Sequence, residues 1–498
     1  MNIIKIDGDN LVLEQVESVA LHGAKVIIDP QAVSKINRCR EFVEKIVNAD
    51  KTVYGINTGF GKLCNQRISR KDIEKLQENL VLSHAFGVGP FFSQEEVRAI
   101  MLLRANVLTK GHSGVRLELI QTLLEMLNKG VLPLIPEKGS VGASGDLAPL
   151  AYMALPLMGK GWVVYQGRIM EGNKALKKAG IKPMKFSCKE GLALINGTCV
   201  MTAVGVLSLL KAERLADLAD MAGAMSLEAA LCTPEAFDRN VQKVRGYKGQ
   251  RRSAENLVNL TRQSEIREFH KACFKVQDPY SFRCMPQVHG AVRDSISHVR
   301  SVLEIEINSA TDNPLIFPDQ NQVISAGNFH GEPVALAMDF LCIAVSELAN
   351  ISERRIAGLI NPEISGLPAF LVKEPGVNSG FMMAEIVAAS LVSENKCLSH
   401  PASVDSIPTS IDQEDHVSMG TIAARKAREV IRNVEDVLAI EFLAAAQGIF
   451  FRFPLKPGIG TGKIYRHIRK KIQPVLKDRL LSEDLNEMKE LMREGFKL

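Results

Sequence analysis

A short run of small residues, Gly142-Ala143-Ser144-Gly145-Asp146, offers unusual chemistry. Gly145 has no side chain to shield its backbone nitrogen, so a tightly folded loop can bring this nitrogen to the Ala143 carbonyl carbon. Ring closure with loss of water, followed by dehydration of Ser144, gives a ring with an exocyclic methylidene. Such a group is a strong electrophile, which no ordinary side chain supplies. Alternatively, Ser144 and Asp146 only cap the helix predicted after them.

The same segment nearly matches the Gly-x-Ser-x-Gly turn that exposes the nucleophile of many serine hydrolases. Asp146 stands where that motif has its last glycine, and the flanking residues lack the pattern of an α/β sheet. A serine hydrolase that uses Ser144 therefore stays open as a rival function. The sequence contains no phosphate-binding loop, no HExxH motif and no paired histidine spacing, so no metal site is predicted.

Apolar residues at helical spacing predict the elements that must hold this segment. Ser93 and Glu96 form a capping box at the start of one helix, and Gly130 ends the next. Longer apolar patterns run through residues 198–231, 288–303, the stretch that begins at 332, and 423–438.

These longer helices, of about 25–35 residues, exceed the globular mean of about 12, and several lack a continuous polar face. They predict a mainly α-helical chain with a long-helix bundle that is shared between subunits. We expect a smaller N-terminal lobe over residues 1–110 and the bundle over residues 111–498.

The composition excludes several classes of protein. With 46% hydrophobic and 23% charged residues, a chain of 498 residues can bury a large core, which excludes intrinsic disorder. A net charge of +5 over this length and only 5% aromatic residues argue against a nucleic-acid partner.

The cysteines and apolar segments indicate the cellular compartment of the protein. The nine cysteines form no CxxC pair, and the N-terminus lacks the apolar core of a secretory signal. We therefore expect a reducing, cytoplasmic environment. Residues 192–210 carry no charge but include Asn196 and other polar side chains, so we expect a buried helix and no membrane span.

The segment GSVGASGDLAPLAYMA resembles the prosthetic-group segment of the aromatic amino-acid ammonia-lyases. In that family the Ala-Ser-Gly tripeptide carries methylidene-imidazolone (MIO). Further segments, from about residue 50 to about residue 450, resemble family blocks in the family order: TVYGINTGFGKL, LVLSHAFGVG, EGLALINGT, VQDPYSFRCMPQVHGA, NSATDNPLIF, GNFHGEPVA, NSGFMMAE and HPASVDSIPTSIDQEDHVSMG. The resemblance implies a long-helix bundle of the ammonia-lyase/fumarase-like type, in a homotetramer whose active sites use residues of more than one subunit.

The resemblance also implies a role for each matching residue. Ala143, Ser144 and Gly145 would form the MIO electrophile, with no external cofactor. Tyr54 lies in a glycine-rich segment suited to a mobile lid that excludes water. Asn196 would form a hydrogen bond close to the MIO, because an unpaired buried amide is costly.

Four more residues would handle the substrate. Arg283 would bind its carboxylate through two hydrogen bonds, and Tyr280 is a candidate acid or base. Gln277 would bind the substrate or order the site, and Phe329 would pack beside the MIO ring. Without the resemblance, Arg283 would be expected in a structural ion pair and Phe329 in the core.

The pair Ser83-His84 matches the histidine-specific members of the family, whereas phenylalanine and tyrosine lyases usually have an aromatic residue or His followed by Leu. An imidazole needs polar partners for two nitrogens, which His84 and Glu414 can supply. The expected reaction is the deamination of L-histidine to trans-urocanate and ammonia, with Glu414 or Tyr280 as the base. The alternatives are a tyrosine or phenylalanine ammonia-lyase, an aminomutase, and a non-catalytic helical oligomer.

Four positions depart from the expected family pattern. Asp412 stands where Asn is usual, Met285 replaces Gln, Phe86 replaces Ala and His289 replaces Met. The negative charge of Asp412 close to Glu414 is expected to affect the pH optimum and the strictness of substrate choice, but not the class of reaction.

Overall fold

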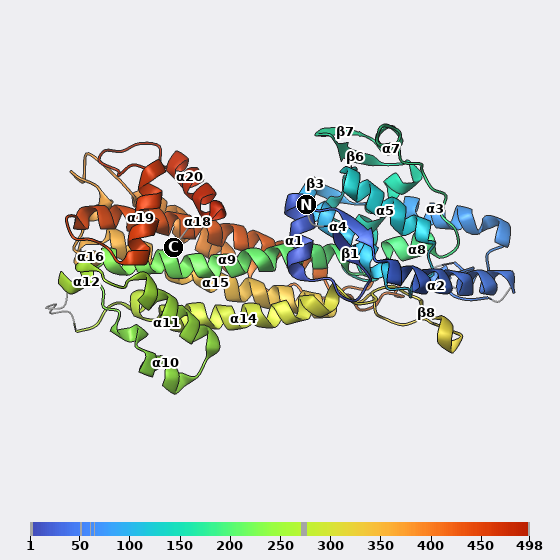
Figure 1. Cartoon of the computed structure of the whole chain (residues 1–498), viewed down its shortest axis with the longest axis horizontal. Helices are drawn as coiled ribbons and strands as arrows, with labels where there is room; N and C mark the ends of the chain where they lie inside the picture. The colour runs from blue at the N-terminus through green and yellow to red at the C-terminus, as the bar shows by residue number, and fades with distance from the viewer. Residues whose placement is uncertain (1–2, 50–51, 60, 64, 270–275, 497–498) are drawn as a thin grey trace. The chain divides into compact units, whose positions relative to one another are not determined.

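The structure, a computed structural model, describes residues 3–49, 52–59, 61–63, 65–269 and 276–496. Over these residues the chain is mainly helical and groups into two compact units (Figure 1). Unit 1 consists of Met1–Ser208, Arg300–Asp339 and Pro401–Arg425, and unit 2 of Leu209–Val299, Phe340–His400 and Lys426–Leu498. The division predicted at residue 110 falls inside unit 1.

Unit 1 combines helices with small sheets. Strand β1 pairs with β2 in parallel, and the pairs β3–β5, β4–β6, β6–β7 and β8–β9 are antiparallel. The elements are β1 (Ile4–Ile6), α1 (Leu13–His22), β2 (Val26–Ile28), α2 (Pro30–Asn48), α3 (Ile73–His84), β3 (Val88–Phe91), α4 (Gln94–Thr109), α5 (Leu117–Lys129), β4 (Leu132–Pro133), β5 (Pro136–Lys138), α6 (Leu147–Ala154), β6 (Trp162–Tyr165), β7 (Arg168–Glu171), α7 (Gly172–Ala179), α8 (Glu190–Ile195), β8 (Leu315–Phe317) and β9 (Gln322–Ile324).

The helix ends in unit 1 follow the local sequence. Ser93 Oγ accepts from the Glu96 backbone N–H, and the Glu96 carboxylate accepts from the Ser93 N–H, which confirms the predicted capping box of α4. Gly130 ends α5 in the left-handed conformation, at φ 71°, a backbone geometry that glycine adopts without strain.

Four long helices have residues in both units: α9 (Cys199–Ala229), α14 (Met285–Glu306), α15 (Glu332–Ile360) and α18 (Gly420–Arg452). Their lengths of 31, 22, 29 and 33 residues confirm the predicted long helices, although α14, with 22 residues, is shorter than the expected 25–35. The other helices of unit 2 are α10 (Arg239–Arg245), α11 (Lys248–Leu260), α12 (Glu265–Phe269), α13 (Tyr280–Arg283), α16 (Pro362–Ser365), α17 (Met382–Leu398), α19 (Ile459–Lys471) and α20 (Leu481–Glu494).

A buried carboxylate links three long helices inside unit 2. Glu441 of α18 accepts from Arg355 at 2.6 and 2.8 Å, from Ser352 at 2.6 Å and from Ser226 at 2.7 Å. Arg355 and Ser352 belong to α15, and Ser226 belongs to α9. Because a buried charge is costly unless it is paired, this network fixes how these helix segments pack together.

The uncharged stretch at 192–210 is not one continuous helix, because Asn196–Thr198 separate α8 from α9. In the described part of the chain, α15 is the helix whose length and apolar composition match a membrane span. Two thirds of its most apolar window (67%) is buried inside the protein, as in the core helices of large proteins. The seven described cysteines are free; Cys64 and Cys273 lie outside the described residues.

Candidate active site

A cavity of about 690 Å³ in unit 1 brings together residues that are far apart in the sequence. Six of the predicted site residues line it: Tyr54, Ala143, Ser144, Asn196, Phe329 and Glu414. Asn196 is the C-cap residue of α8, and the other five lie in loops. The predicted electrophile and one of the two predicted bases therefore share one cavity.

The backbone at Gly145 lies too close to a neighbouring segment for any side chain. Gly145 has φ +74°, and a Cβ atom there would lie 2.2 Å from the Gly197 carbonyl oxygen. The Asp146 N–H donates to that oxygen at 2.8 Å. Within the described residues, the Gly145 N–H itself donates no hydrogen bond. The nitrogen needed for ring closure is therefore both unshielded and free.

Ser144 is held at both of its oxygens. Its carbonyl oxygen accepts from the Gly197 N–H at 3.3 Å and from Asn196 Nδ2 at 3.4 Å. Its hydroxyl donates to Glu414 Oε1 at 2.9 Å. The buried Arg104 donates to the Asn196 carbonyl at 2.6 Å and so fixes the segment that carries these donors.

Asp146 is the N-cap residue of α6, as predicted, but its side chain makes no capping bond to that helix. Its carboxylate instead accepts from the backbone N–H groups of Val200 and Met201, at 2.9 and 3.0 Å, in the first turn of α9. The Thr421 hydroxyl, in the first turn of α18, also donates to it. Complete burial raises the pKa of Asp146 to about 6, and these hydrogen bonds act in the opposite direction. Asp146 therefore ties the tripeptide to the starts of two long helices.

A tight loop aims Glu414 at Ser144. Thr409 and Glu414 exchange backbone hydrogen bonds of 2.9 and 3.3 Å, and the Thr409 hydroxyl donates to Glu414 Oε2 at 2.8 Å. Between them, Ser410, Ile411 and Asp412 have positive φ angles of 54, 55 and 58°. Three successive left-handed residues cost free energy, so the surrounding contacts must hold this loop in place.

The described lining of the cavity has acidic groups and no Lys or Arg. Glu414 and Asp415 line it, together with histidines and amides. Such a lining favours a cationic group, such as the ammonium of an amino acid, over a carboxylate. The described lining therefore offers no Lys or Arg side chain to pair with a substrate carboxylate.

Unit 2 contains three further predicted site residues, Gln277, Tyr280 and Arg283. Arg283 Nη2 donates to Gln277 Oε1 at 3.1 Å, and the guanidinium lies over the Tyr280 ring at 4.8 Å from its centre. Tyr280 is 71% exposed. No described carboxylate pairs with Arg283, so its guanidinium has the charge and the donors to bind an incoming carboxylate.

His84, at the end of α3, does not line the cavity. Its Nδ1 lies 2.8 Å from the Leu80 carbonyl oxygen, which can only accept. This contact favours the tautomer with the proton on Nδ1, which leaves Nε2 as a hydrogen-bond acceptor.

The profile of the aromatic amino acid lyase family matches residues 11–470. The chain belongs to this family. It is 56% identical over 502 residues to histidine ammonia-lyase of Caldanaerobacter subterraneus subsp. tengcongensis, and the alignment covers 99% of this chain and 97% of that protein.

Solved structures confirm the fold of this lyase. Histidine ammonia-lyase from Trypanosoma cruzi matches with a TM-score of 0.93 at 44% identity, over 99% of this chain and 94% of that one. A tyrosine aminomutase from Streptomyces globisporus matches with a TM-score of 0.94 at 39% identity, over 99% and 97%. The predicted mainly α-helical fold and the expected carbon–nitrogen lyase are thereby confirmed.

None of the four departures from the family pattern lines the cavity of this lyase. Phe86 is 83% exposed, and Asp412 is also exposed. Met285 and His289 are buried in unit 2, where His289 Nδ1 lies 2.8 Å from an Asp220 carboxylate oxygen. Burial lowers the pKa of His289, so it is a neutral partner of that carboxylate. The expected effect of Asp412 on pH dependence stays a prediction.

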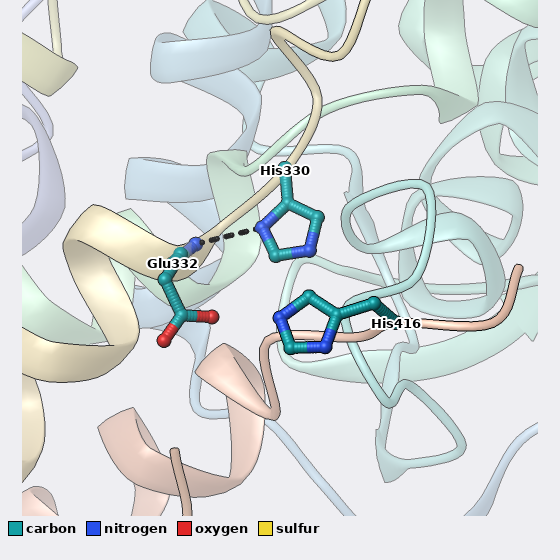
Figure 2. A group of neighbouring side chains, drawn as sticks. All are labelled: His330, Glu332 and His416. Atoms are coloured by element: carbon teal, nitrogen blue, oxygen red, sulfur yellow. Dashed lines mark hydrogen bonds between the residues drawn. The ribbon is translucent and has the colours of Figure 1, made fainter. Parts of the chain in front are cut away.

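Sequence analysis missed three side chains at this cavity that the structure brings together. His330 and His416 line it with parallel rings whose centres are 5.5 Å apart, and Glu332 lies beside them (Figure 2). His330 and Glu332 stand in the family block GNFHGEPVA and His416 in the block that ends in QEDHVSMG. His330 and Glu332 are two positions apart, but His416 follows Glu332 by 84 residues, so no local spacing predicts the three together.

Proposed function

We propose that this lyase converts L-histidine to trans-urocanate and ammonia without an external cofactor. The observation that carries the proposal is the environment of Ser144: a free neighbouring nitrogen at Gly145, two donors on its carbonyl oxygen, and Glu414 on its hydroxyl. The names of the relatives described above support histidine as the substrate.

The residues present fit a methylidene-imidazolone made from Ala143, Ser144 and Gly145. The contact between Gly145 and Gly197 leaves no room for a Cβ, and the free Gly145 nitrogen can close the ring. Once formed, this group would supply an electrophilic carbon that makes the α-amino group of the substrate a better leaving group. The Asn196 amide and the Gly197 N–H stabilise negative charge on the Ser144 carbonyl oxygen, at the place where an oxyanion needs its donors.

The reaction breaks the Cα–N bond, so that the amino group leaves as ammonia with the bonding electron pair, and removes one proton from Cβ to form the double bond of urocanate, with no net oxidation. Either Glu414 or Tyr280 takes the β-proton. Glu414 lies in the cavity of its own chain, whereas Tyr280 belongs to unit 2. Glu414→Gln and Tyr280→Phe separate these roles, because only loss of the base abolishes exchange of the β-proton with deuterated solvent.

We further propose a homotetramer in which Arg283 of another copy completes each site. The described lining of the cavity has no cation, and Arg283 has no carboxylate partner among the described residues. A carboxylate binds a planar guanidinium through two hydrogen bonds. Arg283 can therefore supply the positive charge that the described lining of the cavity lacks.

The substrate is tested by incubating the purified protein with L-histidine, L-tyrosine and L-phenylalanine, without added cofactor. We expect ultraviolet absorbance from urocanate with L-histidine and little product from the other two, because phenyl rings leave Glu414 unpaired. Faster release of a cinnamate would contradict the proposal, and a β-amino acid product would favour an aminomutase.

A further inference from the structure

The cluster of His330, Glu332 and His416 has the donor set of a transition-metal site. One ligand atom from each residue lies within 4.8 Å of the other two. Figure 2 shows the Glu332 carboxylate directed toward the two parallel imidazole rings. Two imidazoles and one carboxylate are a ligand set that proteins use for Zn²⁺ with one open coordination position.

The hydrogen bonding inside the cluster is incomplete. His330 Nε2 and Glu332 Oε2 are buried, and neither has a partner among the described residues. His330 Nδ1 accepts from the Glu332 N–H at 3.3 Å, which is longer than an ordinary hydrogen bond. A coordinate bond to His330 therefore displaces only a weak interaction and satisfies a group that is now unpaired.

The surroundings also favour a cation. Glu414 and Asp415 line the same cavity, whose described lining has no Lys or Arg. His416 is exposed, and its side chain is free to turn toward an ion.

We propose that His330, Glu332 and His416 bind one divalent transition-metal ion of the Zn²⁺ class in the wall of the cavity. Zn–N bonds of about 2.0–2.1 Å require the ligand atoms to draw closer than they are in the structure, which a rotation of His416 allows. His330 and His416 both line the cavity, so an ion bound by them would lie at its wall. The site involves no residue of the proposed reaction.

The test uses the full-length protein, freed of metal with a chelator that is then removed. Co²⁺ is titrated while the visible spectrum is recorded, and Zn²⁺ is then added. We expect d–d absorption that saturates at one Co²⁺ per chain and is lost when Zn²⁺ displaces the ion. Glu332→Gln and His416→Asn should each weaken Co²⁺ binding by about 10-fold or more. Melting curves of each variant report whether it is folded, and exposed His416 tolerates substitution even if Glu332 does not.

Two control variants address adventitious sites. His22→Asn removes an exposed histidine at the end of α1, and Cys397→Ser removes an exposed thiol. Both should bind Co²⁺ as the unsubstituted protein does. The proposal is overturned if no saturable absorption appears, if folded cluster variants bind normally, or if either control weakens binding equally. Because the readout is metal binding, its failure would leave the proposed deamination intact, and inactivity toward histidine would leave the metal site intact.

Discussion

The cavity of unit 1 and the Gln277–Arg283 cluster of unit 2 differ in the charged groups that they contain. The cavity has the tripeptide, two donors on the Ser144 carbonyl and two carboxylates, but no described cation. The unit 2 cluster has an arginine with no described acidic partner and an exposed tyrosine. A zwitterionic amino acid needs both kinds of group. Under the proposed function, bond breaking depends on the cavity of unit 1 and carboxylate binding on the cluster of unit 2, so a substitution can remove either one without the other.

Loss of the electrophile should have the largest effect. Ser144→Ala removes the hydroxyl whose elimination forms the methylidene, so turnover should fall by about 10³-fold or more. Intact mass spectrometry should show the unsubstituted chain short by two waters and the variant not short by both. Near-normal turnover of the variant would show that the unit 1 cavity is not where the chemistry occurs.

Loss of one donor on the Ser144 carbonyl should have the next largest effect. Asn196→Ala should lower kcat by about 10²–10³-fold, the usual result of removing one oxyanion donor. The matched control is Asn328→Ala, because Asn328 donates to the Ala310 carbonyl in an exposed loop. A similar loss of kcat in both variants would point to general damage to unit 1.

A change in unit 2 should act mainly on substrate binding. Arg283→Lys keeps the charge but loses the planar pair of donors, so KM should rise by about 10-fold or more while the two-water mass deficit persists. Arg245→Lys is the control, because Arg245 also lies over a tyrosine ring in unit 2, 5.5 Å from the centre of Tyr247. An unchanged KM for Arg283→Lys would remove unit 2 from carboxylate binding.

The smallest effect concerns stability and pH. Burial raises the pKa of Asp146 from 3.8 to about 6, so the folded state holds this proton more tightly than the unfolded state. The contribution of Asp146 to the free energy of unfolding is therefore greatest below pH 4. This contribution falls as the pH rises to 6, by at most about 3 kcal/mol. Melting temperatures of the unsubstituted protein and Asp146→Asn, compared from pH 4 to 7, should differ in this direction. A constant difference would contradict the account of Asp146.

The local parts of the fold could be predicted from the sequence. The Ser93–Glu96 capping box and the glycine at the end of α5 depend on neighbouring residues, so their spacing is sufficient evidence. The long helices could also be predicted, because their apolar patterns repeat over many turns.

The site could be predicted only where the family resemblance supplied it. Six predicted residues line the cavity, but the resemblance alone could not show that Gln277, Tyr280 and Arg283 belong to the other unit. Asp146 caps a helix that begins 53 residues later, and Thr409 orients Glu414 through a loop of left-handed residues. Contacts of this kind depend on tertiary packing and leave no periodic pattern in the sequence.

The most direct test of whether two copies of the chain form one active site combines two inactive variants in the same oligomer. Ser144→Ala and Arg283→Ala chains are co-expressed with different tags, and oligomers that carry both tags are purified. Each variant alone should be nearly inactive toward L-histidine. If Arg283 completes the cavity of another copy, the mixed oligomers contain intact sites and should form urocanate at least about 10-fold faster than either parent. Mixed oligomers as inactive as their parents would contradict the claim that two copies of the chain form one active site.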